Sequence, residues 1–244
     1  MAEFTIEIAG RAAAVASLFD STRDYCRKYL TDRTPEHFLT VSREELAREQ
    51  ELLRQEALEE GLRPRQFPDP FLERSLIQRK LAEELLGEDI LLFHGSTVAV
   101  DGKAYLFTAH CGTGKSTHTR LWRQRFGDRA VMVNDDKPFL RFSDAGILAC
   151  GAPWSGKHGL DSNISVPLQG ICLLTRGTEN RIRSMGADEA LPMLKQQAFQ
   201  PVSPEKMPKC RELVLRLADR VPLWHMECTR DPQAAEIAWE AMSR

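Results

Sequence analysis

A glycine-rich loop between an apolar run and a helix-forming segment constrains the fold of this chain more than any other feature. The loop Ala109–Thr117 reads Ala-His-Cys-Gly-Thr-Gly-Lys-Ser-Thr, after a strand predicted at Tyr105–Phe107 and before a helix predicted from Ser116 to Phe126. Glycines let successive backbone N–H groups turn inward around an anion, and the start of a helix adds the positive end of its dipole. A strand–loop–helix unit of this kind predicts an α/β domain.

The residue types in the loop predict a nucleotide site. The pattern G-x-x-x-x-G-K-[ST] is matched from Gly114 onward, with Ala109 in place of the first glycine. We expect Lys115 to reach the outer phosphates and the Ser116 hydroxyl to bind magnesium. The predicted cofactors are ATP, or another nucleoside triphosphate, and Mg²⁺. The phosphate-binding residues are expected to be Gly112, Thr113, Gly114, Lys115, Ser116 and Thr117. The alternative is a glycine-rich turn that contains a lysine by chance.

Two adjacent acids follow the next predicted strand, 130–133. Asp135 and Asp136 lie only one helix beyond the loop. Neighbouring carboxylates at a strand end are stable with a bound cation, or with a raised pKa on one of them. A raised pKa would suit that acid as a base toward a substrate hydroxyl. The alternative is an Asn-Asp-Asp turn on the surface.

Further strands and turns predict a mixed sheet. Asp101-Gly102 between apolar runs indicates a hairpin, and Asp144–Gly146 separates a second pair of short strands. Asp231-Pro232 indicates the start of a last helix. The remaining elements are expected as strands at 168–175 and 221–228 and helices at 187–199 and 204–219.

Residues 1–70 are expected to form an N-terminal appendage and residues 71–244 the core. Phe4–Ile8 alternates like a strand, and a mostly helical or irregular stretch is expected from there to about Leu39. Ser42 and Glu45 have the spacing of a capping box at the start of a charged helix that runs to about Glu60. Three prolines at 64–70 then mark the junction, before a helix to about residue 86.

Composition excludes several function classes. The 33 lysines and arginines are balanced by 35 acids, which argues against nucleic acid as a partner. No apolar stretch is long enough for a membrane span. The start of the chain lacks a signal-peptide pattern, and its six cysteines are scattered as expected of reduced thiols. We therefore expect a cytoplasmic protein without a membrane partner.

Four segments follow one another along the chain in a specific order: His94-Gly95, the loop Gly112–Thr117, the pair Asp135-Asp136, and Gly151–Lys157. This order resembles the HPr serine kinase/phosphorylase family and its distant relatives, the ATP-dependent phosphoenolpyruvate carboxykinases. The resemblance implies an α/β fold: a mixed β-sheet P-loop core of HPr kinase/carboxykinase type flanked by helices. Residues 1–70 do not resemble the separate N-terminal domain of the classical family members.

The resemblance also implies roles for single residues. Asp135 would be the catalytic base, Asp136 would hold magnesium together with Ser116, and His94 would lie beside the acidic pair. The glycine-punctuated segment at 151–158 predicts an active-site loop, in which Lys157 meets the substrate or the transferring phosphate. The alternative there is an ordinary turn with Trp154 in the core.

These expectations favour a kinase that transfers the γ-phosphate of ATP to a hydroxyl. The acceptor would be a serine of a peptide or protein, or a small molecule. The sequence does not determine the oligomeric state, and a homo-oligomer is one of the options. One alternative is a nucleotide-binding sensor without transfer, and a further one is a carboxykinase-like lyase. His118, one turn into the helix after the loop, is expected on the exposed face of that helix.

Overall fold

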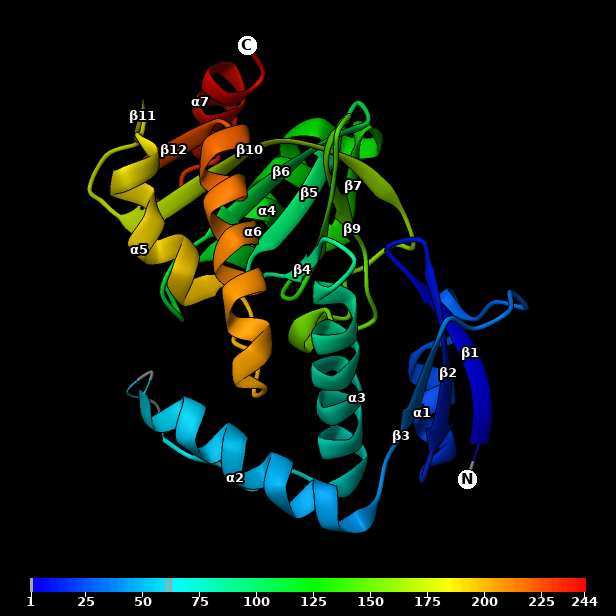
Figure 1. The fold of residues 1–244 in the computed structure, drawn as a ribbon. Helices are drawn as coiled ribbons and strands as arrows, with labels where there is room; N and C mark the ends of the chain where they lie inside the picture. The colour runs from blue at the N-terminus through cyan, green and yellow to red at the C-terminus, as the bar shows by residue number, and fades with distance from the viewer. Residues whose placement is uncertain (1, 60, 62) are drawn as a thin grey trace. The chain divides into compact units, whose positions relative to one another are not determined.

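The computed structural model describes residues 2–59, 61 and 63–244 and divides into two compact units (Figure 1). One unit runs up to Glu84, and the other comprises Leu85–Arg244. The division lies within helix α3 (Asp69–Leu86), close to its end. The proline-rich segment at 64–70, where the junction was predicted, overlaps the first two residues of this helix.

The first unit contains a three-stranded sheet in the order β1 (Ala2–Ile8), β2 (Arg11–Ser17), β3 (His37–Thr40). Strand β1 confirms the first predicted strand. The expectation of a helical or irregular stretch up to Leu39 was wrong, because β2 and β3 lie within it. Strand β2 is rich in alanine, and pairing along β1 outweighs alanine's intrinsic preference for helix. Only the short α1 (Asp20–Tyr25) and the 3₁₀ turn η1 (Arg27–Tyr29) are helical there.

Helix α2 (Arg43–Glu59) begins at the predicted capping box. The Ser42 backbone N–H donates to Glu45 Oε2 at 2.9 Å, and the Glu45 N–H donates to Ser42 Oγ at 3.3 Å. Farther along α2, the buried Glu49 accepts hydrogen bonds from Ser75 and Arg79 of α3. These contacts fix the start of α2 and join the helix to α3. The predicted last residue of the helix, Glu60, lies outside the described residues.

Replacing Ser42 with alanine tests the capping box. We expect Ser42→Ala to lower the free energy of unfolding by about 1 kcal/mol, because one helix N–H loses its acceptor. Urea unfolding of the purified chain measures this loss. Ser42→Thr keeps the hydroxyl and serves as the control, so an equal loss in both variants would contradict the assignment.

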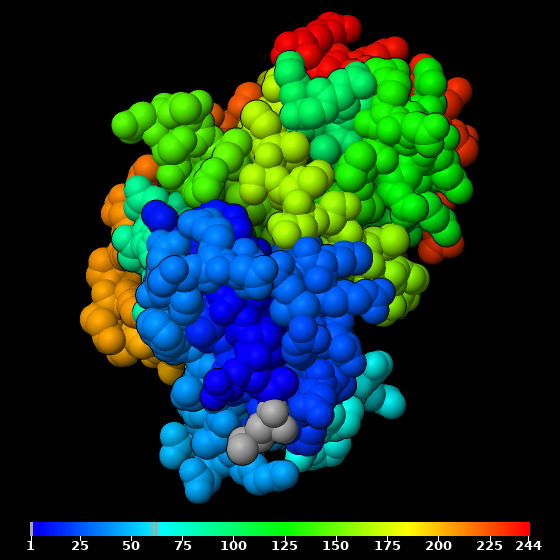
Figure 2. Space-filling view, turned by 90° about the vertical axis from the view of Figure 1, so that its right-hand side faces the viewer, coloured from blue at the N-terminus to red at the C-terminus, as the bar shows by residue number. Residues whose placement is uncertain are grey.

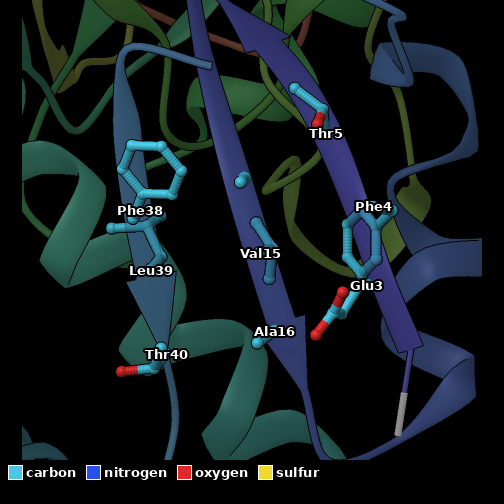
Figure 3. Close-up of a pocket in the computed structure, with 9 residues that line it drawn as sticks. Glu3, Phe4, Thr5, Val15, Ala16, Phe38, Leu39 and Thr40 are labelled. Carbon is cyan, nitrogen blue, oxygen red and sulfur yellow. The ribbon is translucent and has the colours of Figure 1, made fainter. Parts of the chain in front are cut away.

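One face of the small sheet carries a shallow hollow of about 400 Å³ (Figure 3). Ala14 and Ala16 of β2 lie at its centre, with Thr5 of β1 paired to Ala14 on one side and Phe38 of β3 on the other. Phe38 is 74% exposed. Figure 2 shows the N-terminal strands, in the darkest blue, at the surface of the first unit.

The second unit is built on a nine-stranded mixed sheet. Its long strand β10 (Ser165–Arg176) pairs antiparallel with β9 (Gly146–Cys150) at its start, then parallel with β6 (Lys103–Thr108) and β12 (Leu223–Cys228). The predicted α/β class and the mixed sheet are confirmed. The other strands are β4 (Ile90–Leu92), β5 (Ser96–Val100), β7 (Ala130–Asn134), β8 (Phe139–Ser143) and β11 (Arg181–Ser184), of which β11 was not predicted.

Helices cover both faces of this sheet (Figure 1). Helices α5 (Ala187–Gln197) and α6 (Met207–Arg220) bury one set of apolar side chains against it. Helices α4 (Lys115–Phe126) and α7 (Gln233–Met242) bury another set, centred on Trp122. Among the described residues, no helix is both long and apolar enough to cross a membrane.

Candidate active site

The loop Ala109–Thr117 connects the end of β6 to the start of α4, as predicted. Gly112 and Gly114 have φ angles of 75° and 128°, a region that side chains other than glycine enter at a cost. Ala109 is buried, and its φ is not positive. The replacement of the first glycine of the pattern by alanine therefore puts no strain on the backbone.

Lys115, the first residue of α4, folds back over the loop. Its ammonium donates to the carbonyl oxygen of Ala109 at 3.2 Å. This places a positive charge beside the turn formed by Gly112 and Gly114, where the amides at the start of α4 also lie. The arrangement suits an anion at the mouth of the loop.

Asp135 belongs to a buried hydroxyl network that reaches the loop. Ser96 Oγ donates to Asp135 Oδ1 at 2.6 Å, and it lies 2.8 Å from Thr119 Oγ1 of α4. The Ser116 hydroxyl hydrogen-bonds the same carboxylate. Burial raises the pKa of Asp135, and the nearby Asp136 adds to this, whereas Ser96 and Ser116 act in the opposite direction. The loop serine and one of the acids therefore meet, as a metal site would require.

Asp136 is paired with His94 instead. His94 Nε2 lies 3.4 Å from Asp136 Oδ1, and both side chains are partly exposed. Burial opposes ionisation of Asp136, but the hydrogen bond from His94 and the charges of Lys137 and Lys115 hold its pKa below the ordinary value. Burial lowers the pKa of His94, which therefore acts as a neutral hydrogen-bond donor to an ionised carboxylate near pH 7.

Asn134 shapes the turn that carries the two acids. Its Oδ1 accepts from the backbone N–H of Asp136 at 2.8 Å and of Lys137 at 2.6 Å. Its Nδ2 donates to the carbonyls of Ala152 and Trp154. One fully buried amide thus fixes the acidic turn and fastens it to the segment 151–158.

The segment 151–158 packs against the acidic turn. Trp154 is buried with its ring against Phe139, as the alternative interpretation expected. A Cβ added to Gly156 would lie 3.3 Å from Asp136 Cβ, so the short turn η3 (Gly156–His158) adjoins the pair. Lys157 is exposed on this turn, next to Gly156. The charge of His158 also lowers the pKa of Asp135.

Gly151 has no room for a side chain. A Cβ there would lie 1.8 Å from the Ser162 carbonyl oxygen and 2.9 Å from that of Val133. We expect Gly151→Ala to cost about 3 kcal/mol or more, because backbone rather than a flexible side chain must move. Thermal and urea unfolding measure the loss. Gly186→Ala is the control, since Gly186 has φ −76° and open space around its Cα, and equal stability of the two variants would contradict the expectation.

Several site residues were not identified from the sequence. Arg176, at the end of β10, donates to the Gly112 carbonyl oxygen at 2.6 Å. The others are Ser96, Thr119 and Asn134. His118 was predicted to be exposed, and this was wrong: it is 2% exposed, packs on Phe107, and accepts a hydrogen bond from Trp122 Nε1 at 3.1 Å. The reason is that this face of α4 covers the sheet.

The sequence model of the SynChlorMet cassette protein ScmC matches residues 77–232 of the chain. The chain belongs to the ScmC family. The part that matches the ScmC model contains the whole site described above, from His94 to Arg176, and leaves out most of the first unit. No curated protein matches the chain.

This ScmC family member is also similar to a solved structure, the HPr(Ser) kinase/phosphatase from Coxiella burnetii. The two share 11% sequence identity at a TM-score of 0.39, and the match covers 62% of this chain and 89% of the other. A likeness at this level says nothing about activity.

Proposed function

We propose that the protein is a magnesium-dependent phosphotransferase that moves the terminal phosphate of ATP, or of another nucleoside triphosphate, to a hydroxyl group. The observation that carries the proposal is the hydrogen bond between Ser116 and Asp135 beside Lys115. It joins an anion-binding loop to a buried carboxylate, and phosphoryl transfer needs both in one place.

The residues near the loop fit a magnesium–triphosphate complex. Ser116 and Asp135 present hydroxyl and carboxylate oxygens, the ligands that magnesium prefers. Within the described residues, no three His, Cys, Asp or Glu side chains form a metal cluster. With Ser116 and Asp135 as its protein ligands, the ion would take its other ligands from phosphates and water. Bound there, magnesium would offset phosphate charge, while Lys115 and the loop amides orient the phosphates.

The geometry favours a division of roles between the acids that is the reverse of the one first expected. Asp135 is buried and bonded to Ser116, which suits a metal-binding carboxylate. Asp136 is partly exposed and ionised, so an incoming hydroxyl can reach it and give it a proton. The raised pKa first expected of the base lies on the buried Asp135, so access to the hydroxyl, and not the pKa, favours Asp136. His94 orients it. We therefore assign Asp136 as the base and Asp135 to magnesium.

Lys157 is assigned to the acceptor side of the site. It is exposed on the turn next to Gly156, whose Cα lies against Asp136. A cation there would attract an acceptor or offset charge on the phosphate in transfer. Both a serine-containing peptide and a small polyol have the hydroxyl that such a site needs.

The test is incubation with γ-labelled ATP and magnesium against serine peptides, polyols and a cell extract of the host. Transfer of label to an acceptor, lost when magnesium is chelated, supports the proposal. Tight nucleotide binding with no labelled product under any of these conditions would overturn it in favour of a nucleotide-binding sensor.

A further inference from the structure

A hollow of about 340 Å³ adjoins the loop, and the acidic pair is not part of its lining. The loop residues 112–114 and the first turn of α4, at Thr117 and His118, form one wall. The end of β10, at Arg176 and Gly177, and residues 228–230 after β12 form the rest. Its size lies within the range of small-ligand sites, and neither acid nor His94 lines it.

The hollow is positively charged. Arg176 and Arg230 line it, and no aspartate or glutamate does. Burial lowers the pKa of His118 to about 3, so this histidine is neutral and the charge comes from the arginines. Arg176 is engaged with the Gly112 carbonyl. Among residues 2–59, 61 and 63–244, the guanidinium of Arg230 has no recorded hydrogen bond or ion pair.

The wall opposite the loop is held in place without a ligand. The Thr229 N–H donates to Asn180 Oδ1 at 2.8 Å, and the Asp231 N–H donates to Thr229 Oγ1 at 3.0 Å. The Gly177 N–H donates to the Cys228 carbonyl at 3.2 Å. These bonds fix the chain on both sides of Arg230, as expected of a preformed site.

The position of the hollow determines what it can bind. If the last phosphate of a triphosphate were bound between Lys115 and Asp136, the rest of the molecule would extend across Gly112 and Gly114 toward Thr117, and these three residues line the hollow. We propose that the hollow binds the nucleoside part of the nucleotide, with Arg230 as the side chain that contacts it. The chemical class is a ribose joined to a flat base, and an arginine offers it hydrogen bonds or stacking. This inference rests on the proposed function.

The test compares ATP with inorganic tripolyphosphate, both as magnesium complexes, by calorimetry. The unmodified chain should bind ATP more tightly than tripolyphosphate. Arg230→Ala should weaken ATP binding about tenfold and change tripolyphosphate binding much less, because it removes a contact to the nucleoside only. Arg211→Ala, an exposed arginine on α6, serves as the matched control and should bind both ligands normally.

The outcomes separate this inference from the proposed function. Unchanged ATP affinity in Arg230→Ala, or an equal loss for both ligands, would overturn the nucleoside assignment while leaving phosphate binding intact. If the unmodified chain binds neither ligand, both the nucleoside assignment and the proposed function are wrong.

Discussion

Lys115→Ala is expected to lose nearly all phosphate transfer. The Lys115 ammonium lies at the loop, 3.2 Å from the Ala109 carbonyl oxygen, where it would offset the charge of the proposed transferring phosphate. Removing such a charge-stabilising group costs roughly a hundredfold to a thousandfold in rate. Transfer of label from γ-labelled ATP measures the rate. Calorimetry measures how much nucleotide affinity the substitution removes.

Lys103→Ala is the control for this variant. Lys103 is an exposed lysine at the start of β6, the strand that leads into the loop, so its loss removes a similar charge away from the loop. We expect normal transfer. Equal activity of both lysine variants would exclude a phosphate role for Lys115.

The acid variants should separate metal binding from proton transfer. Asp136→Asn is expected to lower transfer by about a hundredfold to ten-thousandfold with nucleotide binding retained, because the base is lost. Asp135→Asn is expected to weaken mainly the magnesium-dependent part of nucleotide binding. Calorimetry with and without magnesium, combined with the transfer assay, distinguishes the two variants.

The opposite pattern would restore the roles expected from the sequence. Asp135→Asn would then lose transfer but keep magnesium-dependent binding, and Asp136→Asn would lose the metal effect. Full transfer by Asp136→Asn would exclude it as the base. His94→Gln is a useful companion, since an amide at this position can still donate to Asp136.

Elements with local signals were predicted from the sequence. The turn between β5 and β6 is one, because Asp101 and Gly102 both have positive φ, as the Asp-Gly pair requires in a tight hairpin. The capping box at Ser42 and Glu45 is another, since its bonds join residues three apart.

Elements that depend on distant partners were not predicted. Strand β2 is mostly alanine, and only its pairing with β1 and β3 makes it a strand. The exposed β11 exists through its pairing with β12. His118 is buried partly because Phe107 of β6 lies against it, which is a distant contact. Its other neighbour, Trp122, is four residues farther along α4, so this contact was readable from helical spacing.

The same distinction holds for the candidate site. The loop is one continuous segment of the chain and the acidic pair is another, so each could be identified from its residue types. Ser96 and Arg176 come from separate strand ends and carry no spacing signature. Asn134 directly precedes the acids, but its residue type does not show that it fixes their turn. The proposed division of roles between Asp135 and Asp136 was also not predictable, because the sequence does not say which acid faces Ser116 and which faces His94.

The hydroxyl network around Ser96 has a fixed direction. An ionised Asp135 only accepts, so Ser96 gives its one proton to the carboxylate and must itself accept from Thr119. The Thr119 proton is then committed to Ser96 and withheld from the carbonyls of Lys115 and Ser116, which lie 3.4 Å away. Each bond in such a one-way chain polarises the next, so helix α4, strand β5 and the carboxylate behave as one cooperative unit. A valine at position 119 would break this unit without touching the loop or either acid.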